Sequence, residues 1–334
     1  MMRITAAALF FLCSFLAAGS GGWQLAAQSH AASPATDYPS KPVRWIVTVP
    51  PGGGVDFMAR LYGQKVSEVL KQSVVVDNRP GATGTIGMEL VARATPDGYT
   101  VVVISVADLI IASISRSRSV DPMKDFVPVT LLATTPLVLV IHPSLNASTL
   151  QEFIAMAQNQ PGKINYASGG TGGIQHLATE LFKHEAKVDL VHVPYKGTGP
   201  GLIDLLAGHV QVTLTSTAAA IPHVKAGRLR GLAIMGKARS PLAPDLPTFA
   251  EAGLPRVDMA VWYGVLAPAR TPPAIVDKLA QTITTVARMP DVREKISASG
   301  AEPAQSTPAD FGVFLGNERE KLIKIARDVD IRID

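Results

Sequence analysis

The chain has almost no cysteine and few charged residues. Cys13 is the single cysteine among 334 residues, so neither a disulfide within the chain nor a zinc site built from several thiolates can form. Charged residues make up 17% of the chain, with a formal net charge of +4, and no run of five or more like charges occurs. This pattern argues against a nucleic-acid groove or a polybasic membrane patch.

Long uninterrupted helices are also disfavoured, because 28 glycines and 25 prolines argue against a coiled coil or a long helical bundle. What the sequence does contain is apolar side chains, at 47% of all residues. That fraction is sufficient for a buried core and excludes wholesale disorder. The length fits one large domain or two of ordinary size.

The N-terminal segment has the layout of a secretory signal peptide. Arg3 precedes an uncharged apolar run over residues 4–19, and small residues follow near 25–31. A membrane anchor needs about 20 apolar residues, and this run is shorter and lacks a positive flank. A lipoprotein would use Cys13, but the bulky Leu12 stands where such signals need a small side chain. We therefore expect residues 1–31 to be cleaved as a signal peptide, leaving a soluble protein outside the cytoplasm without a lipid anchor.

The first part of the mature chain predicts alternating strands and helices. Apolar or β-branched runs at 43–49, 73–76 and 99–105 indicate strands. A helix starting at Asp56 and another over 85–94 separate them. Connections of this length permit parallel pairing, so we expect an α/β unit.

A second α/β unit is predicted after the apolar segment 137–141. Thr149 and Glu152 have the spacing of a capping box, which starts a helix through Gln158. We expect crossings between the units near 137–142 and 258–264. The other expected elements are strands at 164–167, 190–193, 210–214, 229–234 and 260–266, a helix containing His176, and helices at 201–207, 274–288, 292–297 and 308–327.

Two glycine-rich loops stand between a predicted strand and a predicted helix, at 51–56 and 168–173. Glycines there allow backbone N–H groups to point outward, and the following helix adds its positive dipole end, so the pair predicts an anion site. The alternative is that glycine only permits tight turns. Neither loop has the lysine of a phosphate loop, and the first fits the dinucleotide fingerprint poorly, so a carboxylate is the favoured anion.

No catalytic or metal constellation emerges from the sequence. Ser168 lacks the glycine-flanked context of a nucleophile elbow. His176 and Glu180 could pair on one helix face, but no third ligand stands at metal spacing. We expect no catalytic residue, no metal and no cofactor.

Three further segments could contribute to a binding site. Tyr195 lies in a loop after a strand, Ser216 and Thr217 offer hydroxyls where another strand closes, and Trp262 with Tyr263 could form the wall of a cleft at the second crossing. The alternatives are a polar surface loop for Tyr195 and core packing for the aromatic pair.

A series of motifs runs through essentially the whole mature chain. They are Tyr38–Val43, Pro51–Asp56 with Ala59-Arg60, Asn78–Ala82, Pro96–Thr100, Asp125–Val129, Ser168–Gly172 with His176–Ala178 and Glu180, Val193–Gly197, Ala226–Arg230, Pro247-Thr248, Glu251–Gly253 and Trp262–Gly264. In these motifs the sequence resembles the extracytoplasmic solute receptors of tripartite tricarboxylate transporters, the Bug or TctC-type receptors.

The resemblance implies a two-lobed α/β fold of the periplasmic-binding-protein type, with a cleft between the lobes (type II, Venus flytrap). It implies that residues 32–140 with 260–334 form lobe 1 and that 141–259 form lobe 2. A ligand carboxylate would be held between the two glycine loops, partly through water. The expected ligand-binding residues are Gly53, Gly54, Asp56, Ser168, Thr171, Gly172, Tyr195, Ser216, Thr217, Trp262 and Tyr263.

Two departures from the family pattern affect the pocket. Residues 107–111 replace the usual Asn-Pro-x-Leu-Tyr pattern, so that wall differs. Neutral Ser216 and Thr217 stand where many relatives carry an acidic residue, which argues against an amino-acid ligand. The implied function is a periplasmic receptor, not an enzyme, that captures a di- or tricarboxylate or an aromatic carboxylate and delivers it to membrane permease subunits. We expect a monomer. A ligand-presenting sensory subunit and an extracytoplasmic α/β enzyme are the alternatives.

Overall fold

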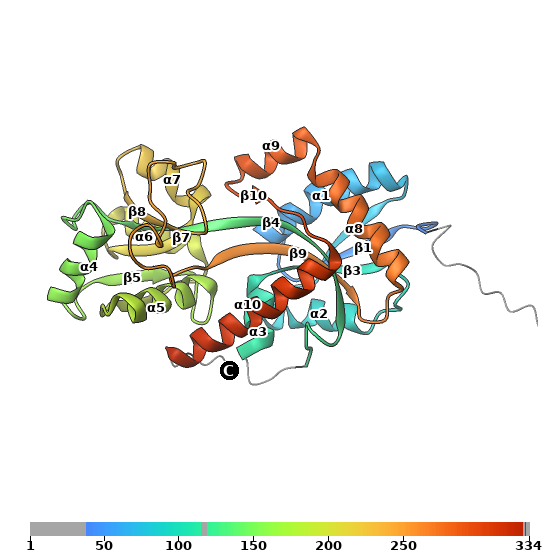
Figure 1. Cartoon of the computed structure of the whole chain (residues 1–334), viewed down its shortest axis with the longest axis horizontal. Coiled ribbons are helices and arrows are strands. Elements are labelled where there is room, and N and C mark those ends of the chain that lie inside the picture. The colour runs from blue at the N-terminus through green and yellow to red at the C-terminus, as the bar shows by residue number, and fades with distance from the viewer. Residues whose placement is uncertain (1–37, 115–118, 330, 332–334) are drawn as a thin grey trace, which may run out of the picture. The chain divides into compact units, whose positions relative to one another are not determined.

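In the computed structural model, which describes residues 38–114, 119–329 and 331, a mixed β-sheet carries helices on both faces (Figure 1). The strands are β1 (Val43–Val47), β2 (Val74–Asn78), β3 (Thr100–Ser105), β4 (Phe126–Ile141), β5 (Asn165–Ser168), β6 (Val191–Pro194), β7 (Val212–Ser216), β8 (Arg230–Met235), β9 (Ala260–Pro268) and β10 (Glu302–Pro303). The helices are α1 (Gly54–Leu70), the short 3-10 helix η1 (Ala82–Gly84), α2 (Thr85–Ala92), α3 (Val106–Ile114), α4 (Leu150–Asn159), α5 (Ile174–Ala186), α6 (Thr198–Ala207), α7 (Thr217–Lys225), α8 (Pro273–Ala287), α9 (Pro290–Ala298) and α10 (Pro308–Asp328).

The strand order is β2-β1-β3-β9-β4-β7-β5-β6, with β8 and β10 also paired to β4. β1 pairs in parallel with both β2 and β3, which confirms the parallel arrangement predicted for the first unit. We call β2, β1, β3, β9 and the start of β4 the first half-sheet. The end of β4 with β7, β8, β5 and β6 is the second half-sheet.

Strand β4 joins the two half-sheets. Its first part pairs with β9 as far as Pro136, and from Leu137 onward it pairs with β7 and β8. Figure 1 shows β4 and β9 running side by side. From the sequence, only the apolar segment 137–141 and a crossing near 137–142 were expected here; Pro128 and Pro136 lie in the first part of the strand, and proline is unusual inside a central strand.

Alternate residues of β4 enter separate parts of the core. Leu137 and Leu139 pack with side chains of α4 and α5, whereas Val138 and Val140 pack with those of α6 and α7. A strand that is apolar at every position is typical of a sheet covered on both faces. The capping box at Thr149 is confirmed at the start of α4, where Glu152 N–H donates to the threonine hydroxyl.

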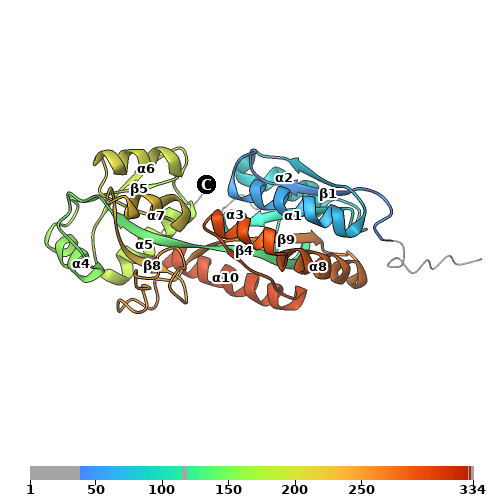
Figure 2. The same ribbon diagram turned by 90° about the horizontal axis from the view of Figure 1, so that it is seen from above.

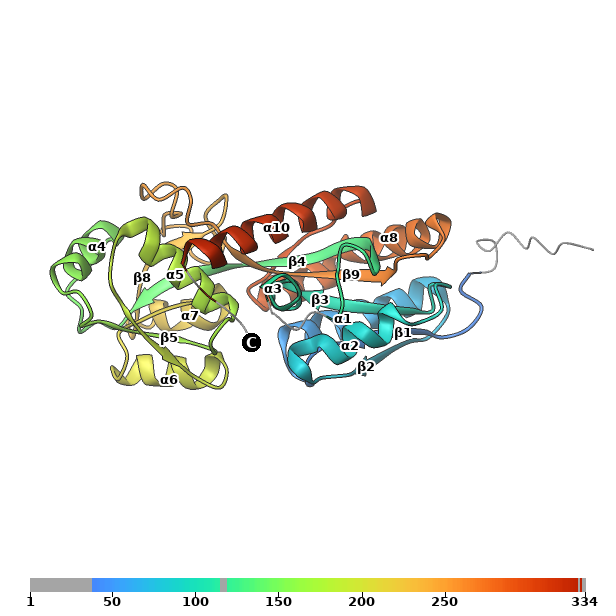
Figure 3. The same cartoon turned by 90° about the horizontal axis from the view of Figure 1, so that it is seen from below.

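Helices from distant parts of the sequence cover the first half-sheet. α1 and α8 lie next to each other on one face (Figure 2), and their side chains share a buried cluster with β1. α2, α3 and α10 contribute to the cluster on the other face, where α10 packs along β4 (Figure 3). The C-terminal helices therefore complete the core of the first half-sheet.

Two helices were not predicted from the sequence. α3 follows β3 without a break, and both are apolar, so periodicity does not separate them. α7 begins directly after β7, with Ser216 as its N-cap. In addition, α6 begins at Thr198, where the sequence predicted a loop as far as Pro200.

Candidate ligand-binding site

The first glycine loop connects β1 to α1. Gly53 is the N-cap of α1 and has extended backbone without a side-chain cap. A Cβ atom on Gly54 would lie 2.3 Å from the Tyr263 hydroxyl oxygen, so only glycine allows β9 to bring this phenol against the helix start. Burial raises the pKa of Tyr263, which therefore remains a hydrogen-bond donor at neutral pH.

Asp56 stabilises this loop from behind. Its buried carboxylate accepts hydrogen bonds from Gly52 N–H at 3.0 Å, Arg60 Nε at 3.0 Å and Asn78 Nδ2 at 2.9 Å. Burial acts to raise the pKa of Asp56, but these hydrogen bonds outweigh it and hold the pKa below its ordinary value. The carboxylate is thus ionised and fully engaged with the protein.

The second glycine loop connects β5 to α5, and side chains of the following helix fix it. Gly169 N–H donates to the side-chain oxygen of Gln175 at 2.7 Å, and Gly172 N–H donates to Nδ1 of His176 at 3.0 Å. Gly170 and Gly172 have φ values of +141° and +77°, which favour glycine. This loop conformation depends on residues that are not glycine.

Two histidines stack beneath the second loop. The rings of His176 and His192 lie 4.0 Å apart and nearly parallel, and Tyr166 stacks on the other face of His192. Nε2 of His192 lies 2.6 Å from the Ser168 hydroxyl. Burial, followed by the neighbouring His176, lowers the pKa of His192 to about 4, and burial also lowers the pKa of His176. Both rings are neutral at pH 7.

This histidine pair makes stability depend on pH. The unfolded chain binds a proton at His192 near pH 6.5, the folded chain only near pH 4, so the unfolded state holds more protons between these values. Stability is lost as the pH falls through this window. We expect the free energy of unfolding to drop by about 2 kcal/mol more between pH 6.5 and 4.5 than it does in a His192→Gln variant.

Urea titrations at several pH values measure this difference. Replacing the exposed His184 by glutamine is the matched control and should leave the wild-type profile unchanged. Parallel profiles for wild type and His192→Gln would contradict the assignment.

Two adjoining cavities form a groove at the ends of β1, β3 and β5. One has a volume of about 420 Å³ and is lined by the second glycine loop, by Thr83 and Gly84 of η1, and by α3. The other, of about 360 Å³, is lined by the first glycine loop, the start of α3, Ile174 and Tyr263. The two share Val49, Pro50 and Ala107, and we call them together the groove.

The groove is lined by backbone, by apolar side chains and by hydroxyl side chains such as those of Thr83, Thr171 and Tyr263. The first residues of α1, α3 and α5 all border it, so three helix N-termini converge there. No described residue that lines it has a charged side chain. Free N–H groups at helix starts favour an anion, and a carboxylate accepts several such hydrogen bonds at once. The groove can therefore bind a carboxylate without a cationic side chain.

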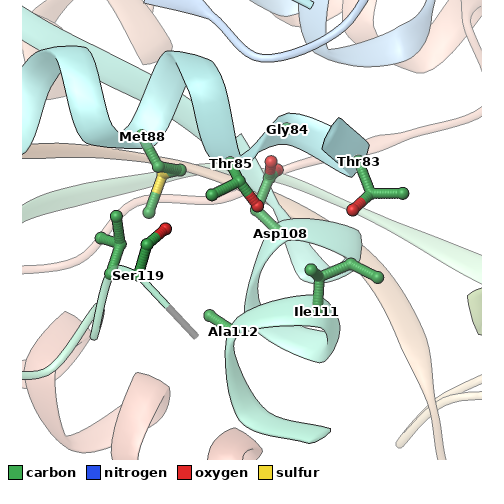
Figure 4. A pocket seen from close by; sticks show the side chains of 9 residues that line it. Thr83, Gly84, Thr85, Met88, Asp108, Ile111, Ala112 and Ser119 are labelled. Atoms are coloured by element: carbon green, nitrogen blue, oxygen red, sulfur yellow. The ribbon is translucent and has the colours of Figure 1, made fainter. Parts of the chain in front are cut away.

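A third, small cavity of about 20 Å³ adjoins the groove and has room for about one water molecule. Asp108 lines it, and Figure 4 shows this side chain reaching from α3 toward the turn at Gly84 and Thr85. One carboxyl oxygen accepts the Ser105 N–H at 2.8 Å, as in a helix cap. Burial raises the pKa of Asp108.

The chain matches the model of the tripartite tricarboxylate transporter family receptor over residues 58–331. It belongs to this family of extracytoplasmic solute receptors. The family comprises binding proteins rather than enzymes, and the two-lobed α/β fold expected from the sequence is confirmed by solved structures of such receptors.

Individual relatives cover most of this receptor. The BugT protein of Bordetella pertussis is 35% identical over 301 residues, which span 90% of this chain and 92% of BugT. The structure of R. palustris Rpa4515 with adipate is 34% identical, with a TM-score of 0.77, and covers 89% of this chain and 99% of that chain. The structure of MatC from Rhodopseudomonas palustris with bound malate is 30% identical, with a TM-score of 0.73. The match covers 86% of this chain and 99% of MatC.

In this receptor, five of the residues expected from the sequence line the groove. Gly53, Gly54 and Tyr263 line one cavity, and Thr171 and Gly172 line the other. The structure thus brings together residues from both glycine loops and from β9.

The other expected residues lie behind the groove or away from it. Asp56 and Ser168 are buried and make the hydrogen bonds described above. The Tyr195 hydroxyl donates to Asp204 at 2.6 Å. Ser216 caps α7, and buried Thr217 donates to the Gly300 carbonyl at 3.1 Å. Trp262 is 1% exposed and donates from its indole nitrogen to Glu318.

One part of the groove lining, the loop after β2, was not predicted from the sequence. Pro80, Gly81, Thr83 and Gly84 line the groove beside α3, whose residues 107–111 were expected at the pocket wall. In the sequence, residues 78–82 stand out only as a motif shared with the receptor family. Since β2 is parallel to β1, the loop after β2 emerges at the same edge of the sheet, and that topology was the available clue.

Among the described residues, no group of three or more histidine, cysteine, aspartate or glutamate side chains could hold a metal ion. Within the same residues, every helix is too short or too polar to cross a membrane.

Proposed function

We propose that this receptor captures a small carboxylate in the groove and delivers it to the membrane subunits of a tripartite permease. The observation that carries the proposal is the convergence of two glycine loops and three helix starts on a groove whose described lining has no charged side chain. The relatives with adipate and malate support a carboxylate as the ligand. A di- or tricarboxylate and an aromatic carboxylate are the classes considered.

In this proposal the carboxylate binds between the first loop, at Gly53 and Gly54, and the second loop, at Thr171 and Gly172. The Tyr263 hydroxyl lies beside Gly54 and provides a further donor. Asp56 and Ser168 act indirectly, by holding the loops in position. An α-ammonium group would find no acidic partner among the described residues that line the groove, so the ligand lacks an amino group.

The surrounding organisation follows from the same proposal. Residues 1–31, which lie outside the described residues, are a signal peptide cleaved on export to the periplasm. Residues 32–140 with 260–334 form lobe 1, and 141–259 form lobe 2. The receptor acts as a monomer and contacts the permease when loaded.

A thermal-shift screen of carboxylic acids against their amides tests the proposal. An acid that binds the folded state raises its stability by about 2.7 kcal/mol at a hundredfold excess over Kd. We expect at least one acid to raise the melting temperature, while its amide, which lacks the charge, has no effect. Uptake of that acid by cells with the permease should then require the receptor. Shifts produced equally by acids and amides would overturn the carboxylate assignment.

A further inference from the structure

Side chains of the protein occupy the loop N–H groups on both sides of Thr171. Gly170 N–H donates to the Ser168 hydroxyl at 3.2 Å. Gly172 N–H donates to Nδ1 of His176 at 3.0 Å. Within the part of the chain that the structure describes, no group accepts the Thr171 N–H, and Thr171 is exposed and lines the groove. The Thr171 N–H is therefore the group of this segment that remains available to an anion.

The bond from Gly172 to His176 determines the orientation of the peptide that follows Thr171. Gly172 is buried and His176 is 8% exposed, so water does not readily replace this bond. A buried N–H without a partner is destabilising, and the loop would rearrange to avoid it. The glycines at 170 and 172 make such a rearrangement easy, because glycine adopts many backbone conformations. Nδ1 of His176 thus selects one conformation of a loop that would otherwise have several.

The surroundings of His176 keep Nδ1 available as an acceptor. An imidazole nitrogen accepts a hydrogen bond only when it carries no proton, so the bond from Gly172 requires a neutral ring with its proton on Nε2. Burial has the largest effect on the pKa of His176 and lowers it; Glu180 acts against burial and Lys183 acts with it. The ring of His192 lies 4.0 Å away and nearly parallel, which fixes the plane of the His176 ring.

We propose that His176 is a positioning residue for ligand binding. Its Nδ1 holds the peptide between Thr171 and Gly172, and the Thr171 N–H and hydroxyl then bind the ligand carboxylate. His176 lines neither cavity, so it acts through the loop and not by contact with the ligand. A loop that is fixed before binding loses less conformational freedom when the ligand arrives, so the affinity is higher. This inference rests on the proposed carboxylate-binding function and assigns the group that orients its second loop.

Two substitutions at position 176 separate the acceptor from the packing of the ring. His176→Phe keeps an aromatic ring for the stack but has no acceptor, whereas His176→Asn keeps an acceptor oxygen on the same carbon that carries Nδ1 but has no ring. Calorimetry on the intact mature receptor, with an acid identified in the screen, gives the affinities. We expect His176→Phe to bind about twentyfold more weakly than wild type and His176→Asn to bind within about fivefold of it. His184→Phe, at an exposed position of the same helix, is the control and should bind as wild type does.

The order of the two variants decides the inference. If His176→Asn binds as weakly as His176→Phe, or more weakly, ring packing and not the acceptor supports the site, and the inference is wrong. It is also wrong if His176→Phe binds as tightly as wild type. If no acid in the library binds the wild-type receptor, the proposed function fails instead.

Nitrogen-15 NMR of the wild-type receptor labelled at histidine gives a second measurement that does not depend on how well the variants fold. The chemical shifts of the two ring nitrogens show which of them carries the proton. We expect His176 to have its proton on Nε2 and none on Nδ1 at pH 7. A proton on Nδ1 at this pH would overturn the inference whatever the variants do, because Nδ1 could not then accept from Gly172.

Discussion

Replacing Thr171 by phenylalanine is expected to weaken carboxylate binding by at least a hundredfold. Thr171 is exposed on the second glycine loop and lines the groove, so the larger ring would occupy the position of the ligand. Because the side chain is exposed rather than packed in the core, the fold should tolerate the change. Calorimetry with an acid identified in the screen measures the loss, and the melting temperature without ligand reports on the fold.

Two controls make the Thr171 result specific. Thr171→Ser keeps a hydroxyl and adds no bulk, so it should bind within a few-fold of wild type. Thr285→Phe adds the same ring to an exposed position on α8, away from the groove, and should bind normally. Undiminished affinity in Thr171→Phe would show that the ligand does not lie against this loop.

Gly300→Ala is expected to destabilise the receptor by about 3 kcal/mol. Gly300 has φ +77°, a conformation that L-residues adopt only with strain. A Cβ atom there would lie 2.2 Å from Cβ and 2.6 Å from Cα of Ala218, in the first turn of α7. Backbone atoms cannot rotate away, so the α9–β10 loop or α7 must shift, and the bond from Thr217 to the Gly300 carbonyl would be strained.

Gly227→Ala separates backbone strain from collision. Gly227 has a similar φ of +69°, but an added Cβ would meet nothing within 4 Å. The Gly227→Ala substitution should therefore lower the free energy of unfolding by about 1 kcal/mol, which is the backbone strain alone. Chemical denaturation of both variants gives the comparison. Equal losses would mean that the approach of Ala218 does not restrict position 300.

The sequence predicted the parts of the site that the backbone determines. Two glycine loops between strand and helix can be recognised from residue order alone, because glycine, strand and helix patterns are local. Their meeting at one groove does not follow from strand pairing, because β1 and β5 belong to different half-sheets that β9 and β4 join by antiparallel pairing. The local pattern was sufficient to place Gly53, Gly54, Thr171 and Gly172 in these two loops, which line the groove.

Prediction was weaker where side chains from several elements had to be assigned to a face. Trp262 and Tyr263 are neighbours on β9 and so point to opposite sides of the sheet. Tyr263 lines the groove, whereas Trp262 packs against Phe311 and Phe314 of α10. The sequence alone does not say which residue of such a pair faces a cavity, because both faces of β9 are covered.

Helix α3 shows a second limit. Residues 100–114 are mostly apolar, and a nearly continuous apolar run fits a buried strand and a buried helix equally well. The cap formed by Asp108 on Ser105 ends the strand and starts the helix. The Ser-x-x-Asp spacing of Ser105 and Asp108 was the available sign of a helix start in this mostly apolar segment.

In the proposed binding mode most of the anchoring groups belong to the peptide backbone, and this affects how the site can be studied. A scan that truncates each side chain to alanine removes no N–H group, so it will leave the anchor almost intact. Such a scan will report on the apolar side chains that line the groove and on the residues that support the loops. The backbone groups that bind the ligand carboxylate will appear unimportant. Substitutions that add volume at the two loops, or that replace a single peptide N–H by an ester oxygen, are the changes that reveal it.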